Sequence, residues 1–257
     1  MKRVVTALLL IPFIVYVVLW ANSLVFLGVL VLVACLCYRE YDGIAAGYGF
    51  GAPGPMGYGA GLLLLVAERD EWLLLAAVAL IALVLAMRTD ELAQSLPRAS
   101  LRLMGILYVF GTWKCAVLIR NHTPAGHWLM FALLVNWSGD IGAYYVGRAF
   151  GRRKLAERVS PKKTWEGTIG SLAASTLMAG AYLVHFVGGV TVFQAVALTL
   201  TTNAAGQLGD LAESAMKRGA GVKDSGTLLP GHGGMLDRVD STLFALPVVY
   251  AYLRFLV

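Results

Sequence analysis

Long apolar runs limit this chain to very few folds. Seven of them are each about as long as a membrane-crossing helix, and they lie near residues 4–20, 23–38, 72–87, 103–119, 126–147, 166–187 and 241–256. Two further runs are less regular: residues 52–67 begin with glycine and proline, and residues 191–209 become polar toward their end, as in a helix that lines a cavity. Inside a bilayer a segment must satisfy its own backbone polar groups, which favours helices. We therefore predict an all-α integral membrane protein with about nine transmembrane helices.

Composition agrees with a membrane protein and argues against other classes. Hydrophobic residues make up 58% of the chain, charged residues 14%, and the mean hydropathy is +0.71, all outside the usual range of soluble domains. The net charge of +6 fits basic loops that meet anionic headgroups, so we expect membrane lipids and no nucleic acid as partners. Cys35, Cys37 and Cys115 lie in or near apolar runs without a CxxC pair, which predicts packing residues and neither a disulfide framework nor a zinc site.

The lysines and arginines predict the orientation of the chain. If every run crosses, the basic loops fall on one side, and positively charged short loops remain in the cytoplasm. We expect a multi-pass protein of the cell inner (plasma) membrane, with its N-terminus and active-site loops cytoplasmic and its C-terminus outside. The first run is long enough to span and lacks a good cleavage site, which predicts a retained helix. The predicted division is N-terminal transmembrane helices in residues 1–125 and a catalytic transmembrane region in residues 126–257, with cytoplasmic loops 148–165 and 210–240.

A carboxylate interrupts the apolar run 126–147. Asp140 lies four residues after Asn136 and four before Tyr144, so the three side chains share one helical face. A carboxylate at membrane depth is costly and usually faces a polar cavity or a partner. The alternative is a hydrogen-bonding cluster that only joins neighbouring helices.

The basic stretch 151–167 joins two apolar runs. Ser160 followed by Pro161 suits a helix N-cap and first turn, and Thr164 offers a second cap. Lys162 and Lys163 beside such helix-start amides would form an anion site suited to phosphate.

Glu166 near the same helix start has two interpretations. It could reach a metal or orient a lysine, or it could simply stabilise the helix dipole. The arginines of this loop are interpreted as topology signals that contact headgroups.

The richest polar stretch covers residues 203–241. Read as a helix, its first half carries one polar face made of Asn203, Gln207, Asp210, Ser214 and Lys217, with Glu213 beside it. The carboxylates of the whole stretch are Asp210, Glu213, Asp224, Asp237 and Asp240, and its cations include Lys217, Arg218, Lys223 and Arg238. Carboxylates without suitably spaced histidines or cysteines favour Mg²⁺ over zinc. Carboxylates together with cations are what a polyphosphate site requires.

His232 lies in the glycine-rich turn of this stretch. It could contact phosphate, transfer a proton, or have neither role. Taken together, the polar stretches predict a phosphate-handling site at the cytoplasmic membrane surface. The residues alone leave open whether the ligand is a nucleotide or a phospholipid, and whether the process is transfer or transport.

One motif resembles a known family. The stretch from Ser214 to Asp240, SAMKRGAGVKDSGTLLPGHGGMLDRVD, resembles the signature of the phosphatidate cytidylyltransferases (CDP-diacylglycerol synthases), and GDLAES, SPKKTWEG and DIGAYYVGRAFG also look like family sequence. The resemblance covers the second half of the chain, from Asn136 onward. The first half is similar only in being a series of apolar runs.

The resemblance implies an enzyme of phospholipid biosynthesis that converts CTP and phosphatidic acid to CDP-diacylglycerol and pyrophosphate with Mg²⁺, with a second cation left open. A phosphatidate oxygen is already anionic, so catalysis would consist mainly of alignment and charge stabilisation. The predicted catalytic residues are Asp210, Asp237, Lys217, Arg218, Asp224 and His232. The predicted substrate-binding residues are Lys162, Lys163, Lys223, Arg238, Ser214, Ser241 and Tyr144. The predicted metal ligands are Asp210 and Asp237 first, then Asp140, Glu213, Glu166 and Asp240. The resemblance is also compatible with a homodimer.

Three rival functions are weighed against this one. The nearest is a CTP-dependent cytidylyltransferase that acts on another lipid phosphate or alcohol, such as an isoprenoid ether lipid. An ion-coupled transporter or channel could use Asp140 and Asp210 along its path, although no repeated halves are visible. A purely structural membrane scaffold would leave the clustered carboxylates unexplained.

Overall fold

The computed structural model describes residues 2–50, 54–69, 71–89, 91–122, 125–228, 231 and 233–256. It divides into two compact units. The first comprises Met1–Phe26, Cys115–Ala215 and Val239–Val257, and the second comprises Leu27–Lys114 and Met216–Arg238. The predicted division at residue 125 separates regions by function, whereas the compact units separate them by packing. The functional division stays a prediction.

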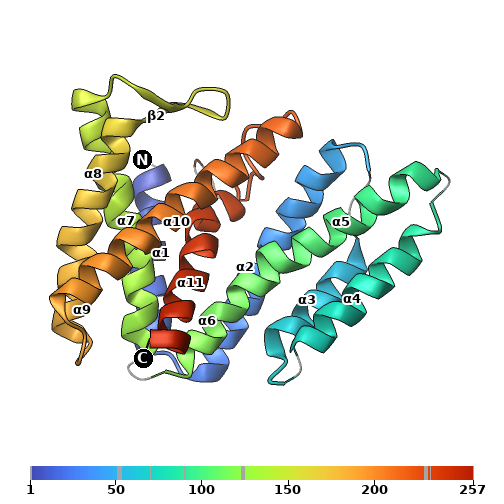
Figure 1. The fold of residues 1–257 in the computed structure, drawn as a ribbon, viewed down its shortest axis with the longest axis horizontal. Helices are drawn as coiled ribbons and strands as arrows, with labels where there is room; N and C mark the ends of the chain where they lie inside the picture. The colour runs from blue at the N-terminus through green and yellow to red at the C-terminus, as the bar shows by residue number, and fades with distance from the viewer. Residues whose placement is uncertain are drawn as a thin grey trace. The chain divides into compact units, whose positions relative to one another are not determined.

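The elements are mostly helices (Figure 1). Those wholly or mostly in the first unit are α1 (Lys2–Leu19), α6 (Thr112–Arg120), α7 (Ala125–Phe150), β1 (Lys154–Ala156), β2 (Ser160–Thr164), α8 (Trp165–Ser175), η3 (Thr176–Gly180), α9 (Ala181–Phe186), α10 (Val192–Gly219) and α11 (Leu236–Leu256). Those of the second unit are α2 (Ser23–Gly47), α3 (Pro55–Val66), α4 (Glu71–Ala86), η1 (Leu92–Gln94), α5 (Ser95–Gly105) and η2 (Ile106–Gly111). Each predicted apolar run falls on helix, and the mostly helical fold is confirmed.

Fewer of the described helices have the length of a membrane span than the apolar runs suggest. In the described part of the chain four helical stretches have the length and apolar composition to cross a bilayer, namely Ser23–Gly47, Leu92–Arg120, Trp165–Phe186 and Leu236–Leu256. Three more apolar helices are shorter, namely Leu8–Leu19, Pro55–Val66 and Trp72–Ala86. Nine spans are therefore not confirmed. In the described part of the irregular run 52–67, α3 covers 12 residues and begins at Pro55, after Gly54, whose φ is 81°.

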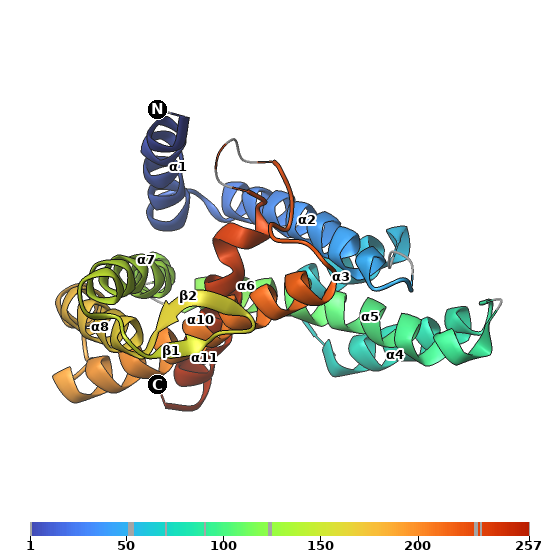
Figure 2. The same ribbon diagram turned by 90° about the horizontal axis from the view of Figure 1, so that it is seen from above.

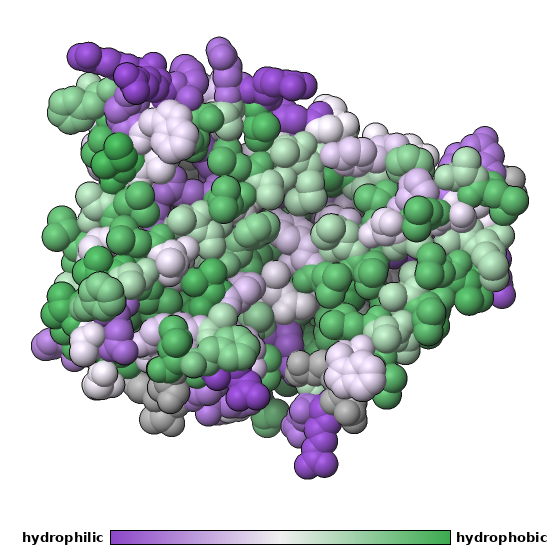
Figure 3. Space-filling view, viewed as in Figure 1, coloured by the Kyte–Doolittle hydropathy of each residue, from purple (hydrophilic) through white to green (hydrophobic). Residues whose placement is uncertain are grey.

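Helices α7 and α8 lie side by side in both ribbon views (Figures 1 and 2). Their backbones are close because glycines face each other at the contact. A methyl group added to Gly142 would clash with the Gly170 carbonyl oxygen. One added to Gly170 would lie 2.5 Å from Cβ of Val146, also closer than atoms can approach. Figure 3 shows hydrophilic residues gathered at the hairpin end of this pair and apolar residues over its middle. The pair therefore presents its polar end where the predicted site residues lie.

A short antiparallel hairpin, β1 and β2, connects α7 to α8. Ser160 lies in β2, so the prediction that it caps a helix is wrong, because the residues that follow it pair with β1 instead of turning into a helix. Thr164 is the N-cap of α8, as predicted, and its hydroxyl accepts the amide hydrogen of Gly167 at 3.1 Å. Lys154 donates to the carbonyl oxygen of Pro161 at 2.7 Å and thus ties the two strands together.

The core of the second unit is rich in aromatic rings. Tyr38 of α2 is fully buried and stacks on Tyr41, and its ring centroid lies 5.3 Å from that of Phe110. A methyl group at Gly57 of α3 would overlap the Tyr38 hydroxyl, so the glycine makes room for this ring. Helix α2 is thereby held firmly in its unit.

Candidate functional site

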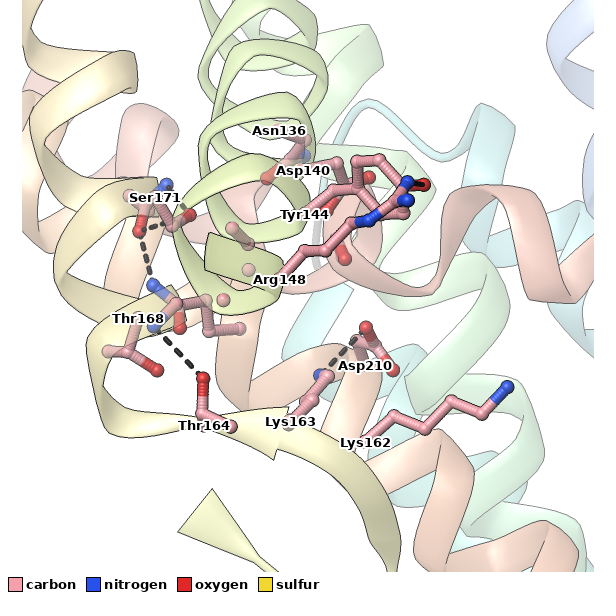
Figure 4. Close-up of a pocket in the computed structure, with 17 residues that line it drawn as sticks. Asn136, Asp140, Tyr144, Arg148, Lys162, Lys163, Thr164, Thr168, Ser171 and Asp210 are labelled. Carbon is pink, nitrogen blue, oxygen red and sulfur yellow. Dashed lines mark hydrogen bonds and ion pairs between the residues drawn. The ribbon is translucent and has the colours of Figure 1, made fainter. Parts of the chain in front are cut away.

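The first unit contains a polar pocket of about 340 Å³ between α7, the hairpin, α8, α10 and α11. Among the residues that line it are Asn136, Asp140, Tyr144, Arg148, Lys162, Lys163, Thr164, Thr168, Ser171, Asn203, Gln207, Asp210 and Ser241 (Figure 4). Six of these were predicted as site residues, namely Asp140, Tyr144, Lys162, Lys163, Asp210 and Ser241. The structure thus brings together predicted residues from four separate segments.

One wall of the pocket is a face of α7. Asn136, Asp140 and Tyr144 all line the cavity, as their spacing of four predicts, and Arg148 continues the same face by one turn. The Arg148 guanidinium donates a hydrogen bond to the Tyr144 hydroxyl at 3.0 Å (Figure 4). Sequence reasoning assigned Arg148 only to the basic loop, although the same spacing identifies it.

The hairpin supplies two lysines. Lys163 lies at the end of β2, and its ammonium nitrogen is 2.7 Å from Oδ2 of Asp210 on α10. The two side chains are 26% and 32% exposed, so solvent reaches the pair. Lys162 extends from the same strand with its side chain exposed (Figure 4). Residues of opposite charge that lie about 47 positions apart in sequence therefore meet in this pocket.

The third wall is the polar face of α10. Asn203, Gln207 and Asp210 line the cavity, and the Gln207 amide donates to Oδ1 of Asn203 at 2.6 Å. Asn203 also donates to Ser171 of α8 at 3.0 Å. The Ser214 hydroxyl donates to Oδ1 of Asp210 at 3.3 Å. These contacts fix the side chains of α10 that face the cavity.

The second unit holds its own charged cluster around Asp237. Lys217 lies 2.5 Å from Oδ1 of Asp237, and both side chains are at most 10% exposed. The Asp237 carboxylate also accepts the amide hydrogens of Ser225, at 3.0 and 3.1 Å, and of Gly234, at 2.8 Å. Gly233 has a φ of 80°, and a Cβ there would lie 2.6 Å from Oδ2 of Asp237. The glycines of the signature thus allow the turn to close around this carboxylate.

Glu40 of α2 belongs to the same cluster, and sequence reasoning missed it. It is 9% exposed, and its carboxylate accepts hydrogen bonds from the backbone of Met235 and Leu236 and from the hydroxyl of Ser225. The available signal was a glutamate just after the apolar run 23–38.

The other predicted residues have varied surroundings. Glu213 is fully buried, and Asp240 is 9% exposed with its carboxylate 2.6 Å from the amide nitrogen of Ser241. The Glu166 carboxylate accepts the amide hydrogens of Arg152 and Arg153 at 3.0 to 3.3 Å. The exposed residues are Arg218, Lys223, Asp224 and Arg238. His232 lies outside the described residues.

The pocket offers hard oxygen donors together with cations. Across the ranges given above, no group of three or more His, Cys, Asp or Glu side chains is gathered as a metal cage. Two carboxylates, Asp140 and Asp210, face a cavity that Arg148, Lys162 and Lys163 also line. Such a set suits a phosphate-bearing ligand whose own oxygens complete the coordination of a bound Mg²⁺. The assignment of individual metal ligands stays a prediction.

Comparison with known proteins gives the family. The model of the cytidylyltransferase family matches residues 1–256. The chain is 46% identical over 134 residues to the phosphatidate cytidylyltransferase of Haemophilus influenzae, an alignment that covers 50% of this chain and 46% of the relative. It is 41% identical over 169 residues to that of Pseudomonas aeruginosa (58% and 56% covered) and 40% identical over 148 residues to that of Bacillus subtilis (57% and 55%). The aligned part spans about half the length of these curated relatives. Because the family model matches nearly the whole sequence, the chain belongs to the cytidylyltransferase family.

Proposed function

We propose that this protein transfers the cytidylyl group of CTP to phosphatidic acid, giving CDP-diacylglycerol and pyrophosphate in phospholipid biosynthesis. The observation that carries the proposal is the pocket in which three cations and two carboxylates converge at the polar end of apolar helices. The relatives named above bear the name of this activity.

The reaction needs alignment more than it needs a strong base. A phosphatidate phosphate oxygen attacks the α-phosphorus of CTP, and a new oxygen–phosphorus bond forms. The bond from the α-phosphorus to the bridging oxygen of the β-phosphate breaks, and pyrophosphate leaves with that electron pair. Because the attacking oxygen is anionic at neutral pH, no proton has to be removed.

The chain's own residues would hold the two substrates in line. Lys162, Lys163 and Arg148 would bind phosphate oxygens and offset the repulsion between two anions. The Tyr144 hydroxyl, which accepts from Arg148, would hold that guanidinium toward the cavity. Lys163 would exchange its contact with Asp210 for one with a phosphate oxygen.

The donor set of the pocket fits Mg²⁺. Asp140 and Asp210 would hold the ion, which takes oxygen ligands and commonly keeps waters and substrate phosphates as its remaining ligands. When bound, Mg²⁺ would neutralise the charge that develops on the phosphates. Asp237 was predicted as a ligand too. In this structure its carboxylate already accepts from Lys217, Ser225 and Gly234.

The membrane arrangement is part of the same proposal. The protein would cross the inner membrane about nine times, with the bilayer locally thinned around the shorter helices. The N-terminus and the basic hairpin would be cytoplasmic, where CTP is found, and the C-terminus would be outside. A homodimer and a second cation are kept as proposals to be tested.

The test is conversion of radiolabelled CTP by the purified full-length protein in vesicles that contain phosphatidic acid. We expect labelled CDP-diacylglycerol and one pyrophosphate per lipid formed. Parallel vesicles with an isoprenoid ether-lipid phosphate, or with diacylglycerol, identify a different lipid acceptor. CTP-independent ion flux without pyrophosphate release would contradict the proposal and support a transporter.

A further inference from the structure

The second unit contains an acidic residue outside the signature that contacts the signature at several points. The Glu40 side chain on α2 accepts a hydrogen bond from the Met235 amide at Oε1, at 2.8 Å. At Oε2 it accepts from the Leu236 amide and from the Ser225 hydroxyl, both at 2.7 Å. These donors lie 185 to 196 positions away in sequence.

Glu40 acts as an N-cap supplied from another helix. The first amides of a helix have no partner within that helix, and α11 begins at Leu236. Three carboxylate or hydroxyl groups satisfy four successive amides at this point: Asp237 accepts from Gly234, Glu40 from Met235 and Leu236, and Ser225 from Asp237. The buried Glu40 carboxylate thus receives three hydrogen bonds at the N-terminus of α11.

The signature is shaped to admit this carboxylate. A Cβ at Gly226 would lie 2.7 Å from Oε1 of Glu40, and one at Gly234 would overlap Oε2. Side chains at these two positions would therefore push Glu40 out of place. The absence of a side chain at these two glycines therefore leaves the space that the Glu40 carboxylate occupies.

The C-terminal end of helix α2 also lies close to the chain on either side of Lys217, the other partner of the buried ion pair. The Tyr48 hydroxyl, just after α2, donates to the carbonyl oxygen of Met216 at 2.9 Å, next to Lys217. A Cβ at Gly47 would lie 2.9 Å from Cβ of Ala220. Thus α2 holds the chain on both sides of the Lys217 and Asp237 pair.

We infer that Glu40 is a positioning residue, which fixes Ser225 and the Met235–Leu236 start of α11 and through them the Lys217 and Asp237 side chains. Its kinetic consequence rests on the proposed function and on the predicted catalytic role of Lys217 and Asp237, but the contact itself does not. It gives the first half of the chain a role in holding the charged cluster of the second unit, which the family motif alone does not indicate.

The test compares purified full-length Glu40→Gln, Glu40→Asp and wild type, with Glu68→Gln, an exposed glutamate of the same unit, as the matched control. The Gln amide nitrogen cannot accept a hydrogen bond, so either Met235 or the Leu236 and Ser225 donors lose their acceptor. We expect kcat to fall about 10- to 100-fold, with KM for CTP and for phosphatidic acid changed less than about threefold. Glu40→Asp keeps the charge on a shorter side chain and should recover part of the loss, while Glu68→Gln should match wild type.

A second readout does not depend on activity. Hydrogen exchange, followed by mass spectrometry, should become faster in Glu40→Gln for peptides that cover residues 225–238, and not for peptides of α3 or α4. Ser225→Ala removes one donor to Glu40 and the acceptor of the Asp237 amide, and it leaves the Glu40 carboxylate with its two amide donors. It should show a smaller change of the same pattern, and it provides the test if Glu40→Gln does not fold.

The outcomes distinguish the positioning role of Glu40 from the proposed function of the protein. Wild-type kcat and exchange in Glu40→Gln would overturn the positioning role. So would uniformly faster exchange together with a kcat loss equal to the loss of folded protein. If wild type turns over no CTP while the localised exchange change is present, the proposed function fails and the structural role of Glu40 stands.

Discussion

The contact between Lys163 and Asp210 allows a sharp test of the pocket, because its expected effects on stability and on activity differ in size. The nitrogen–oxygen distance is 2.7 Å, and the side chains are 26% and 32% exposed. Ion pairs that solvent reaches contribute about 0.2–1 kcal/mol to the free energy of unfolding, since hydration of the separated charges offsets most of the attraction. Lys163→Met should therefore lower that free energy by about 1 kcal/mol or less.

The effect on catalysis should be much larger. If Lys163 binds a phosphate oxygen on which charge develops, its removal should lower kcat/KM about 10²- to 10³-fold, or about 2.7–4 kcal/mol. Lys163→Arg should retain more activity than Lys163→Met because it keeps the positive charge. The assay is initial-rate formation of CDP-diacylglycerol in mixed micelles, with thermal unfolding of the same preparations.

Lys154→Met is the matched control for this prediction. Lys154 lies on the neighbouring strand, is exposed and does not line the pocket, and its ammonium group contacts the Pro161 carbonyl oxygen. The Lys154→Met substitution removes the same charge from the same hairpin and should leave kcat/KM within about threefold of the wild-type value. Equal losses in Lys154→Met and Lys163→Met would show that only the overall charge of the hairpin matters. A Lys163→Met variant with full activity and a clear loss of stability would show that the lysine only neutralises Asp210.

Three further predictions concern the walls of the pocket and its metal. Gly142→Ala should lower the free energy of unfolding, measured by thermal unfolding, by about 1–3 kcal/mol because the new methyl group meets the Gly170 backbone. Its control is Gly28→Ala, which has open space around it and should be neutral or stabilising by up to about 1 kcal/mol. Equal effects of the two substitutions would refute the close contact. Thr164→Ala should cost about 1 kcal/mol by the same measurement through loss of the α8 cap, and Thr164→Ser should recover most of it, so identical unfolding of both variants would contradict the cap. Removal of divalent ions with EDTA should abolish turnover and added Mg²⁺ should restore it, and Asp140→Asn should raise the Mg²⁺ concentration for half-maximal rate about 10-fold or more; an unchanged Mg²⁺ dependence would exclude Asp140 as a ligand.

How well a feature could be predicted from the sequence depends on how far apart in the chain its interacting residues lie. The face of α7 was predictable because the helical repeat alone places Asn136, Asp140 and Tyr144 on one side. The meeting of Lys163 with Asp210 was anticipated only as a chemical need, that cations and carboxylates surround a phosphate. Charge complementarity predicted that Lys163 and Asp210 belong to one site, but it did not predict that these two side chains form an ion pair.

Other features were beyond a local pattern. The Ser160 and Pro161 pair suits a helix start as well as a strand. The pairing of Ser160 with Ala156 of β1 decided between them, and no periodicity over so few residues reveals it. Glu40 was missed because its partners lie at the other end of the chain, and a single sequence carries no information on such a contact. The nine predicted spans stay unconfirmed, because helices such as α3, with 12 residues, are shorter than a bilayer-crossing helix.

The glycine contact between α7 and α8 has a practical consequence for changing which substrates the proposed cytidylyltransferase would accept. Two walls of the pocket meet backbone to backbone, at Gly142 and Gly170, so larger or smaller side chains cannot widen or narrow that seam without separating the helices. Room for a differently shaped lipid or nucleotide must therefore come from elsewhere around the cavity. A mutant library meant to redirect substrate choice should keep this seam constant and diversify the α10 face at Asn203 and Gln207, which line the cavity.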